Sequence, residues 1–470
     1  MKNSLIFSRQ VIVYGVGHIL ARSISFLLLP FYSHYFLPEE FGGMTLIYTF
    51  LGFMNVIVPL GLGSAMMRYY IPANKDDRKT VLSNVYSAAI ISSFCFFILS
   101  LFFYETINET IIFGPALNNR IIWLVSFILT LDCMWSINLA LLRAHNRSVY
   151  FVITNLINVV IVVICNILFV MTFDLGVEGV LMSNFIASFV SFMATVSIVF
   201  EKNFSFSLIS KNIIKKLFTF ALPMLATGIL SMIIELSDRS IISYILQDAA
   251  EVGLYSINYK IGMFMLLVVM GFNMAWQPYF LDSQNKQSLG FITENAIYIG
   301  GLLWAIVSIV VPYIITYEIW GFSIIDKIYW NGIHVIPTIA LGYFFHGIYV
   351  LSVPGMYLSE RPSILMYIKL GGALLNIALN FILIPKYGIE GASTATLISF
   401  FCMAFSAYII NKKLIPEVNY RNPQMVLFIL FILFTFIAYN IIYTNLFLVA
   451  LFFITYSIIV YSALYRKNIK

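Results

Sequence analysis

Fourteen apolar runs of roughly 20 residues dominate this sequence, and they constrain its fold more than any other feature. A helix needs about 20 consecutive apolar residues to cross the hydrocarbon core of a bilayer. We therefore predict an all-α membrane protein with about 14 transmembrane helices. The predicted helices cover residues 9–37, 44–70, 80–104, 118–142, 149–173, 177–200, 215–246, 252–278, 290–317, 332–358, 363–385, 390–411, 424–443 and 446–465.

The overall composition excludes a water-soluble protein. Of the 470 residues, 61% are hydrophobic and 10% are charged, whereas a soluble domain has about 25% charged residues. Lipid must therefore be the solvent for most of the surface. The four cysteines lie in apolar runs without paired spacing, so they predict neither a metal site nor disulfides. The apolar run after Lys2 and Arg9 is too long for a signal peptide, so we expect a retained first helix.

The distribution of basic residues predicts the orientation of the chain. Of 27 Lys and Arg residues, 20 fall at the two termini, in the loops on the same side or at the helix ends that face them, 3 on the opposite side, and 4 deeper within predicted helices. Basic residues collect in cytoplasmic loops, so we expect both termini in the cytoplasm of a bacterial cytoplasmic (inner) membrane. The net charge of +6 is explained by this asymmetry and does not require a nucleic-acid partner.

Three motifs recur at a nearly constant offset, which indicates an internal repeat. Glu40-Phe41-Gly42 matches Glu251-Val252-Gly253, and Gly176-Val177-Glu178-Gly179 matches Gly388-Ile389-Glu390-Gly391. Arg147-Ser148 also matches Arg361-Pro362. Each copy would hold six helices, an even number, so the two copies would be parallel and related by a pseudo-twofold axis along the membrane normal.

The repeat predicts the domain organisation and favours transport. We predict an N-terminal lobe at residues 1–205, a C-terminal lobe at 206–415, and two extra helices at 416–470. Two six-helix lobes around a cleft suit alternating access, in which the lobes rock around a substrate bound near the midplane.

Ionisable residues inside predicted helices are the candidate functional residues, because a charge within the bilayer is costly and usually faces a cavity. The basic candidates for a substrate path are Arg22, Arg239, Lys260 and Lys369. The candidates for carrying a coupling ion are His18, Asp132, Glu235 and Asp238. Internal ion pairs such as Arg22 with Asp132, Glu235 with Arg239 and Asp238 with Lys260 are the alternative, and Lys369 is near enough to the cytoplasmic end to snorkel.

Several motifs are absent, and their absence argues against an enzyme. The sequence contains no phosphate-binding GxxxxGK[ST] loop, no HExxH and no paired-cysteine zinc signature. A membrane glycan-assembly enzyme would need outward catalytic carboxylates, and the pair Glu39-Glu40 fits turn chemistry better. We therefore expect no enzymatic activity and no cofactor.

Four segments resemble the Wzx-type polysaccharide flippases, which transport O-antigen and capsule units and belong to the multidrug/oligosaccharidyl-lipid/polysaccharide exporter (MOP, MATE-like) superfamily. The segments are Leu28-Leu29-Pro30-Phe31-Tyr32 through Gly42, Pro59-Leu60-Gly61-Leu62-Gly63 through Tyr70, Asn380 through Pro385, and Gly388 through Thr396.

The resemblance implies a flippase for undecaprenyl-pyrophosphate-linked oligosaccharide in surface polysaccharide or lipopolysaccharide synthesis. It implies the bilayer and this lipid-linked glycan as partners, with a polysaccharide polymerase or ligase acting afterwards. Arg22, with Arg239, Lys260 and Lys369 behind it, would bind the pyrophosphate and sugars. In the absence of an ATP site, a proton or sodium gradient would supply the energy.

Other readings stay open at this point. A multidrug or metabolite cation antiporter of the same superfamily is the main alternative, although such proteins usually have twelve spans. A lipid II flippase shares the fourteen-helix plan. A glycan-assembly enzyme belongs to a different class, and a purely structural scaffold would not need charges in the middle of the membrane.

Overall fold

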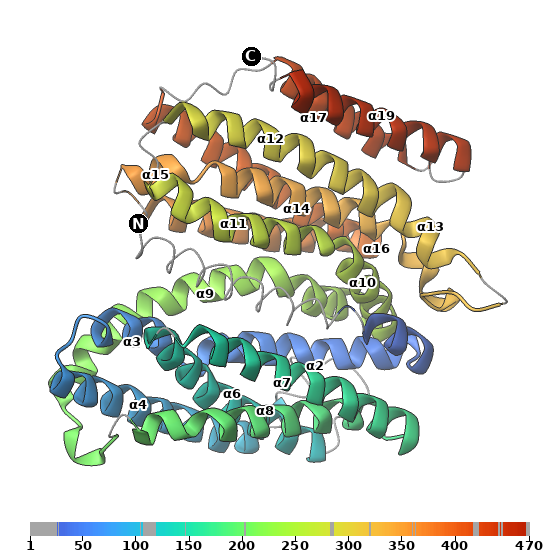
Figure 1. Cartoon of the computed structure of the whole chain (residues 1–470). Coiled ribbons are helices and arrows are strands. Elements are labelled where there is room, and N and C mark those ends of the chain that lie inside the picture. Colours follow the sequence, from blue (N-terminus) through green and yellow to red (C-terminus); the bar gives the residue numbers. More distant parts are fainter. Residues whose placement is uncertain are drawn as a thin grey trace. The chain divides into compact units, whose positions relative to one another are not determined.

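A computed structural model of the chain is helical, with no strand among the residues it describes (Figure 1). The described residues are 26, 28–103, 105–106, 119–145, 147–201, 204–282, 286–318, 321–359, 361, 363–416, 423–439, 442 and 445–466. They form two compact units, one of residues 1–28 and 35–253 and one of residues 29–34 and 254–470. The predicted lobe boundaries stay a prediction. The lobes were defined by repeated motifs, whereas these units are defined by contacts between residues.

The first unit is a bundle of long helices. Its elements are α2 (Pro38–Ile57), α3 (Leu62–Tyr70), α4 (Lys75–Phe102), α6 (Asn119–Ala144), α7 (Ser148–Asn166), the π-helix η1 (Ile167–Thr172), α8 (Gly176–Glu201), the short 3₁₀ helix η2 (Phe206–Leu208), α9 (Lys211–Leu246) and the first turn of α10 (Ala249–Gly262). Helix α6 packs against α4 and α8, and α9 packs against α2 and α3.

The second unit contains the remaining helices. They are the rest of α10, α11 (Phe264–Asp282), α12 (Lys286–Ala305), the π-helix η3 (Ile306–Val310), α13 (Val311–Thr316), the 3₁₀ helix η4 (Lys327–Gly332), α14 (Val335–Leu351), α15 (Pro354–Leu358), α16 (Ser363–Leu414), α17 (Pro423–Ile437) and α19 (Leu446–Arg466). Helix α14 lies at the centre of this unit, where it packs against α11, α12 and α16.

The helices are long and apolar enough for a multi-pass membrane protein. Ten candidate spans and two shorter apolar helices, 425–437 and 447–463, lie in the described ranges. The 52-residue α16 contains the two predicted helices 363–385 and 390–411, which meet at a non-helical Gly388. The all-α membrane fold is therefore confirmed, while the first predicted helix, 9–37, lies mostly outside the described residues.

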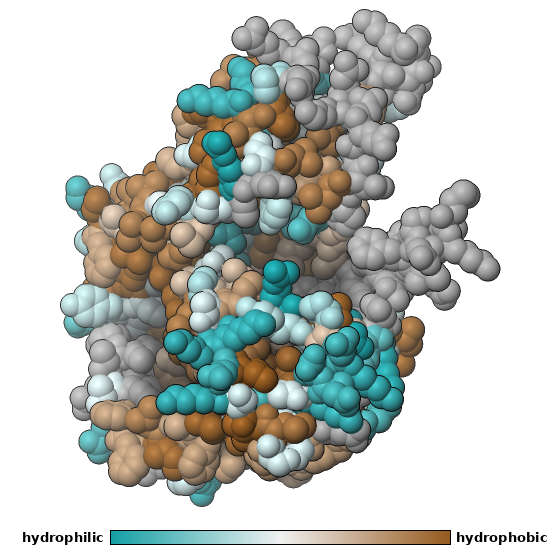
Figure 2. Space-filling view, turned by 90° about the vertical axis from the view of Figure 1, so that its left-hand side faces the viewer, coloured by the Kyte–Doolittle hydropathy of each residue, from teal (hydrophilic) through white to brown (hydrophobic). Residues whose placement is uncertain are grey.

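Large apolar side chains on the outside of the helices show where lipid replaces water. Phe102 at the end of α4 is 80% exposed and Ile437 at the end of α17 is 81% exposed. Figure 2 shows hydrophobic residues over wide parts of one face, with hydrophilic residues gathered in patches between them. Such apolar surface is stable only in contact with hydrocarbon.

Proline residues divide some of the predicted helices into shorter ones. The predicted helix 44–70 is divided into α2 and α3 around Pro59, and Leu60 and Gly61 there adopt positive φ. The predicted helix 332–358 likewise stops before Pro354, which begins α15. Proline lacks an N–H donor and clashes with the preceding turn, which accounts for both breaks. Pro223, in contrast, lies within the continuous α9.

Small residues let the helices of the first unit approach closely. Ala140 of α6, Ala65 of α3 and Ala221 of α9 are all fully buried in one apolar cluster. Association of helices in lipid depends on van der Waals contact rather than on the hydrophobic effect, so small side chains at the contacts favour it. This packing holds α6, which carries Asp132, against its neighbours.

The first glycine of the second repeated motif has a positive φ in both copies. Gly176, before α8, has a φ of 52°, and Gly388, between the two halves of α16, has a φ of 55°. Positive φ is readily adopted only by glycine, so each copy needs a glycine at this turn. The shared conformation supports the internal repeat.

The first repeated motif brings its two glycines together. A Cβ atom on Gly42 would collide with the carbonyl oxygen of Ala249 and lie 3.0 Å from the amide nitrogen of Gly253. A Cβ atom on Gly253 would collide with the carbonyl oxygen of Pro38 and lie 3.1 Å from the amide nitrogen of Gly42. The contact is reciprocal, as expected if a pseudo-twofold axis passes between the two glycines.

Candidate functional site

A polar cluster in the first unit centres on Asp132. Its carboxylate accepts hydrogen bonds from Ser188 Oγ of α8 at 2.6 Å and from Asn55 Nδ2 of α2 at 3.3 Å. Three helices, α2, α6 and α8, therefore converge on one carboxylate. Partners of this kind reduce the cost of a carboxylate within a span, and the role of Asp132 in ion coupling stays a prediction.

A second polar group lies on α9. Arg239 Nη1 is 2.6 Å from Asp238 Oδ1, and it also donates to the backbone carbonyl of Glu235. Asp238 is fully buried and Arg239 is buried. The structure thus brings three of the predicted residues together. Because the Asp238–Arg239 pair carries no net charge, an anionic substrate would have to displace Asp238 from Arg239 to use its full charge.

The second unit has a polar group among aromatic rings. Tyr259 of α10, next to Lys260, shares a hydrogen bond of 2.7 Å with Tyr343 of α14. One turn further along α14, the His346 ring stacks on Tyr349, with ring centroids 5.7 Å apart. Lys369 of α16 interacts electrostatically with His346.

Sequence reasoning did not select His346. Its Nδ1 atom is buried and makes no hydrogen bond within the described part of the chain. The only signal was a histidine in the apolar run Phe344-Phe345-His346, which is equally typical of a packed core residue. Its proximity to Lys369 depends on the packing of α14 against α16, which the sequence does not reveal.

A buried amide cluster lies further along α16. Asn380 Nδ2 donates to Asn376 Oδ1 at 3.0 Å, and Asn376 Nδ2 donates to Thr396 Oγ1 at 3.4 Å. All three residues are fully buried. They link the two halves of α16 across the break at Gly388, so they stabilise the hairpin that also carries Lys369.

Two of the predicted site residues, Arg22 and His18, lie outside the described residues. The role proposed for Arg22 therefore stays a prediction. Within the described ranges, no group of three His, Cys, Asp or Glu side chains is arranged to hold a metal ion.

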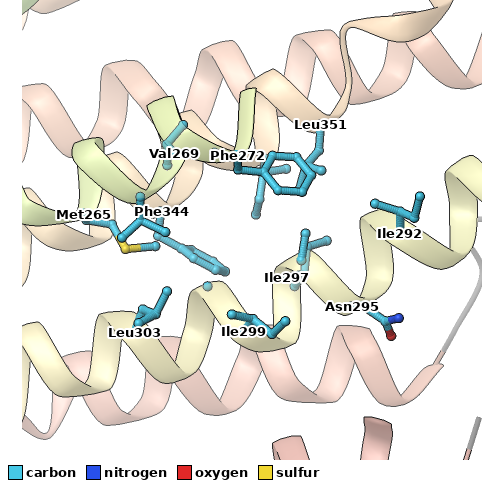
Figure 3. A pocket seen from close by; sticks show the side chains of 15 residues that line it. Met265, Val269, Phe272, Ile292, Asn295, Ile297, Ile299, Leu303, Phe344 and Leu351 are labelled. Atoms are coloured by element: carbon cyan, nitrogen blue, oxygen red, sulfur yellow. The ribbon is translucent and has the colours of Figure 1, made fainter. Parts of the chain in front are cut away.

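Two cavities lie in the second unit. One of about 240 Å³ lies between α11, α12 and α14 and is lined by apolar side chains, with Asn295 at one end (Figure 3). The other, of about 300 Å³, lies between α12, α17 and α19 and is lined in part by Tyr298, Phe428 and Ser462.

Comparison with known families decides the family. Residues 7–284 match the family described as polysaccharide biosynthesis protein. The chain belongs to this family. Residues 223–382 also match the MatE family. A comparison with curated protein sequences finds no match.

Solved structures share the fold along nearly the whole chain. The lipid II flippase MurJ, in an inward closed conformation, matches with a TM-score of 0.76 at 17% identity, covering 98% of this chain and 100% of that one. An inward-facing multidrug resistance MATE family transporter of the MOP superfamily matches at 0.64 and 12% identity, covering 87% and 98%. A MOP superfamily transporter from Pyrococcus furiosus, described as having a binding pocket of reverse polarity, matches at 0.63 and 13% identity, covering 87% and 96%. These matches show that this member of the polysaccharide biosynthesis protein family shares its fold with a lipid II flippase and with MATE family transporters.

Proposed function

We propose that this protein moves an undecaprenyl-pyrophosphate-linked oligosaccharide from the cytoplasmic to the periplasmic leaflet by alternating access. The observation that carries the proposal is the match of residues 7–284 to a polysaccharide biosynthesis family, on a fold shared with a lipid flippase along 98% of the chain. A flippase for a lipid-linked glycan accounts for both likenesses, and the products would serve O-antigen, capsule or another surface glycan.

The pyrophosphate of this substrate needs cationic partners. Arg22 is the first candidate, and Arg239, Lys260 and Lys369 are the others. Arginine binds phosphate through two parallel hydrogen bonds, whereas lysine acts as a point charge. Arg239 is held by Asp238, so its binding of pyrophosphate would release that carboxylate.

The energy source in this proposal is a proton or sodium gradient. Asp132 is the first candidate to carry the ion, because Ser188 and Asn55 bring two polar partners to its carboxylate within a span. Glu235, Asp238 and His18 are the remaining candidates. Flipping that continued unchanged after both gradients were collapsed would exclude this coupling.

The proposed location is the bacterial cytoplasmic membrane, with both termini in the cytoplasm. The asymmetry of Lys and Arg between the two sets of loops supports this orientation. Release of the glycan on the periplasmic side would deliver it to a polymerase or ligase.

A deletion strain tests the proposed function. We expect complete repeat units on undecaprenyl pyrophosphate to accumulate in the cytoplasmic leaflet, and the surface glycan to disappear. Normal surface glycan combined with lethal loss of cell-wall synthesis would instead indicate a lipid II flippase. Re-expression of the intact chain must restore the glycan, which excludes effects on neighbouring genes.

The match to the MatE family favours drug export as the second candidate function. An antiporter for organic cations predicts that the deletion strain keeps its surface glycan and loses tolerance to cationic drugs. The flippase proposal predicts the opposite on both counts, so the same strain separates the two functions.

A further inference from the structure

The cavity between α11, α12 and α14 is lined by residues of three candidate membrane spans. Its lining residues fall within 265–272 of the span 264–281, within 292–303 of the span 289–316, and within 344–351 of the span 335–358. A ligand in this cavity would therefore lie between segments that cross the membrane.

The lining is almost entirely apolar. Figure 3 shows Phe272, Phe344 and Leu303 around the cavity, while Asn295 is the one lining residue with a polar side chain. The cavity reaches the outer surface of the second unit, since the lining residues Val268 and Ile299 are 41% and 45% exposed. A lipid chain could enter from the membrane without passing a polar region.

From this geometry we propose that the cavity binds a segment of the polyprenyl chain of the transported lipid. The inference rests on the proposed function, because that function supplies a substrate with an isoprenoid tail. The tail would be held at the α11–α12–α14 cavity while the charged head group binds elsewhere. The cavity would thus act as a tail site that retains the substrate during the conformational change.

The size of the cavity suits a short length of such a chain. Its volume is about 240 Å³, and an apolar cavity of about 150 Å³ is enough to bind benzene. On that scale it accommodates about ten carbon atoms, or about two prenyl units. The aromatic walls formed by Phe272 and Phe344 offer flat surfaces for the planar double bonds of those units.

Two glycines keep the cavity open. A Cβ atom on Gly300 would lie 3.3 Å from Phe344 Cε2 and 3.7 Å from Met265 Cε, both of lining residues. A Cβ atom on Gly347 would lie 3.2 Å from Val269 Cγ2, also in the lining. Larger side chains at these positions would occupy the space that the prenyl chain needs.

The test uses the full chain, purified in lipid nanodiscs, and undecaprenyl phosphate that carries a photoreactive diazirine in its tail. After irradiation, peptides are mapped by mass spectrometry. We expect labelling of the lining stretches 265–272, 292–303 and 344–351, and competition by unlabelled undecaprenyl phosphate. Labelling that falls only on other helices would overturn the proposal without any variant being needed.

Variants that fill the cavity sharpen the test. Ala296→Phe and Gly300→Leu place bulk in the lining, and we expect at least a tenfold loss of labelling there. Val160→Phe is the matched control, because Val160 is an exposed apolar residue of α7 outside the cavity. Labelling that stays normal in both filled variants, at unchanged melting temperature, contradicts the proposal.

A second probe separates a specific tail site from a general lipid site. A phosphatidylglycerol with a diazirine in a straight acyl chain should label the cavity at least tenfold less than the polyprenyl probe. Equal labelling by both lipids overturns the proposal. The deletion strain tests the proposed function independently of the labelling. If the purified protein is labelled at the cavity but the deletion strain has normal surface glycan, the proposed function is rejected. If the deletion strain accumulates lipid-linked glycan but the purified protein is not labelled at the cavity, only the tail site is rejected.

Discussion

Gly42 and Gly253 lie against each other although 211 positions separate them in the sequence. A Cβ atom on Gly42 would collide with the backbone carbonyl of Ala249, and a Cβ atom on Gly253 would collide with that of Pro38. If the two motifs are copies, as the sequence predicts, the contact is one that a repeat makes with itself across a pseudo-twofold axis.

The Gly42 contact predicts a sharp difference between neighbouring glycines. Gly42→Ala should lower the unfolding free energy by about 1–3 kcal/mol, the usual cost of overpacking. Gly43→Ala is the matched control, because a Cβ atom there meets nothing within 4 Å, and alanine is favoured over glycine inside a helix. Thermal unfolding in detergent measures both. Equal melting temperatures for the two variants would show that the close packing at Gly42 does not contribute to stability.

Asp132 should matter for transport rather than for folding. Asp132→Asn keeps the size of the side chain and can still bond Ser188 and Asn55, so we expect normal protein levels. Flipping should fall at least tenfold and lose its dependence on the ion gradient.

Thr195→Ala serves as the control for Asp132→Asn. It removes another buried cross-helix hydrogen bond of the same unit, the one from Asn138 Nδ2 at 3.1 Å, and flipping there should keep its gradient dependence. A gradient dependence that survives in Asp132→Asn would exclude Asp132 as the ion carrier.

Asp238 should be needed to stabilise Arg239. Removing one partner of a buried ion pair costs about 3–5 kcal/mol, because a charge remains in a low-dielectric environment. We expect Asp238→Ala to lower stability by about that amount, and the double variant Asp238→Ala/Arg239→Leu to recover most of it. Chemical unfolding in detergent provides the measurement.

An exposed ion pair sets the scale for that comparison. Arg147 and Glu201 are bonded at 3.0 Å, but their side chains are 42% and 50% exposed. Arg147→Gln should therefore change stability by about 1 kcal/mol or less. A larger loss for Arg147→Gln than for Asp238→Ala would show that burial does not govern these pairs.

Glu251 predicts a pH dependence at the first turn of α10. Burial, and then the nearby Asp248, raise the pKa of the Glu251 carboxyl above its usual value. The folded state therefore binds its proton more tightly than the unfolded state does. The contribution of Glu251 is most favourable below its unfolded pKa and is lost as the pH rises through its folded pKa. Glu251→Gln should stabilise the protein relative to the parent chain at neutral pH, and this difference should disappear in acid. A stability difference between Glu251→Gln and the parent chain that is the same at neutral and at acidic pH would contradict this prediction.

Much of the fold could be predicted because lipid imposes a simple rule on sequence. Runs of about 20 apolar residues mark the helices, and the motifs around Gly42 and Gly253 revealed the repeat. The breaks were harder to place. Pro59 and Pro354 end helices, whereas Pro223 does not, since neighbouring helices decide whether a freed backbone group is satisfied.

The site was less predictable because it depends on contacts between helices. Asp132 was visible as a charge in a span, but nothing in the sequence shows that Asn55 and Ser188 reach it. His346 and the cavity behind Gly300 were missed for the same reason: single residues in apolar runs do not reveal which neighbours they face.

The most direct test of the account is flipping by the purified full chain in proteoliposomes. Undecaprenyl-pyrophosphate-linked oligosaccharide is placed in both leaflets, and its exposure is followed with a lectin or glycosidase that cannot cross the membrane. The account predicts that the inner-leaflet fraction becomes accessible only when the protein is present, and at least tenfold more slowly with Asp132→Asn. An inner-leaflet fraction that stays protected, while the same vesicles export a cationic drug, would contradict it.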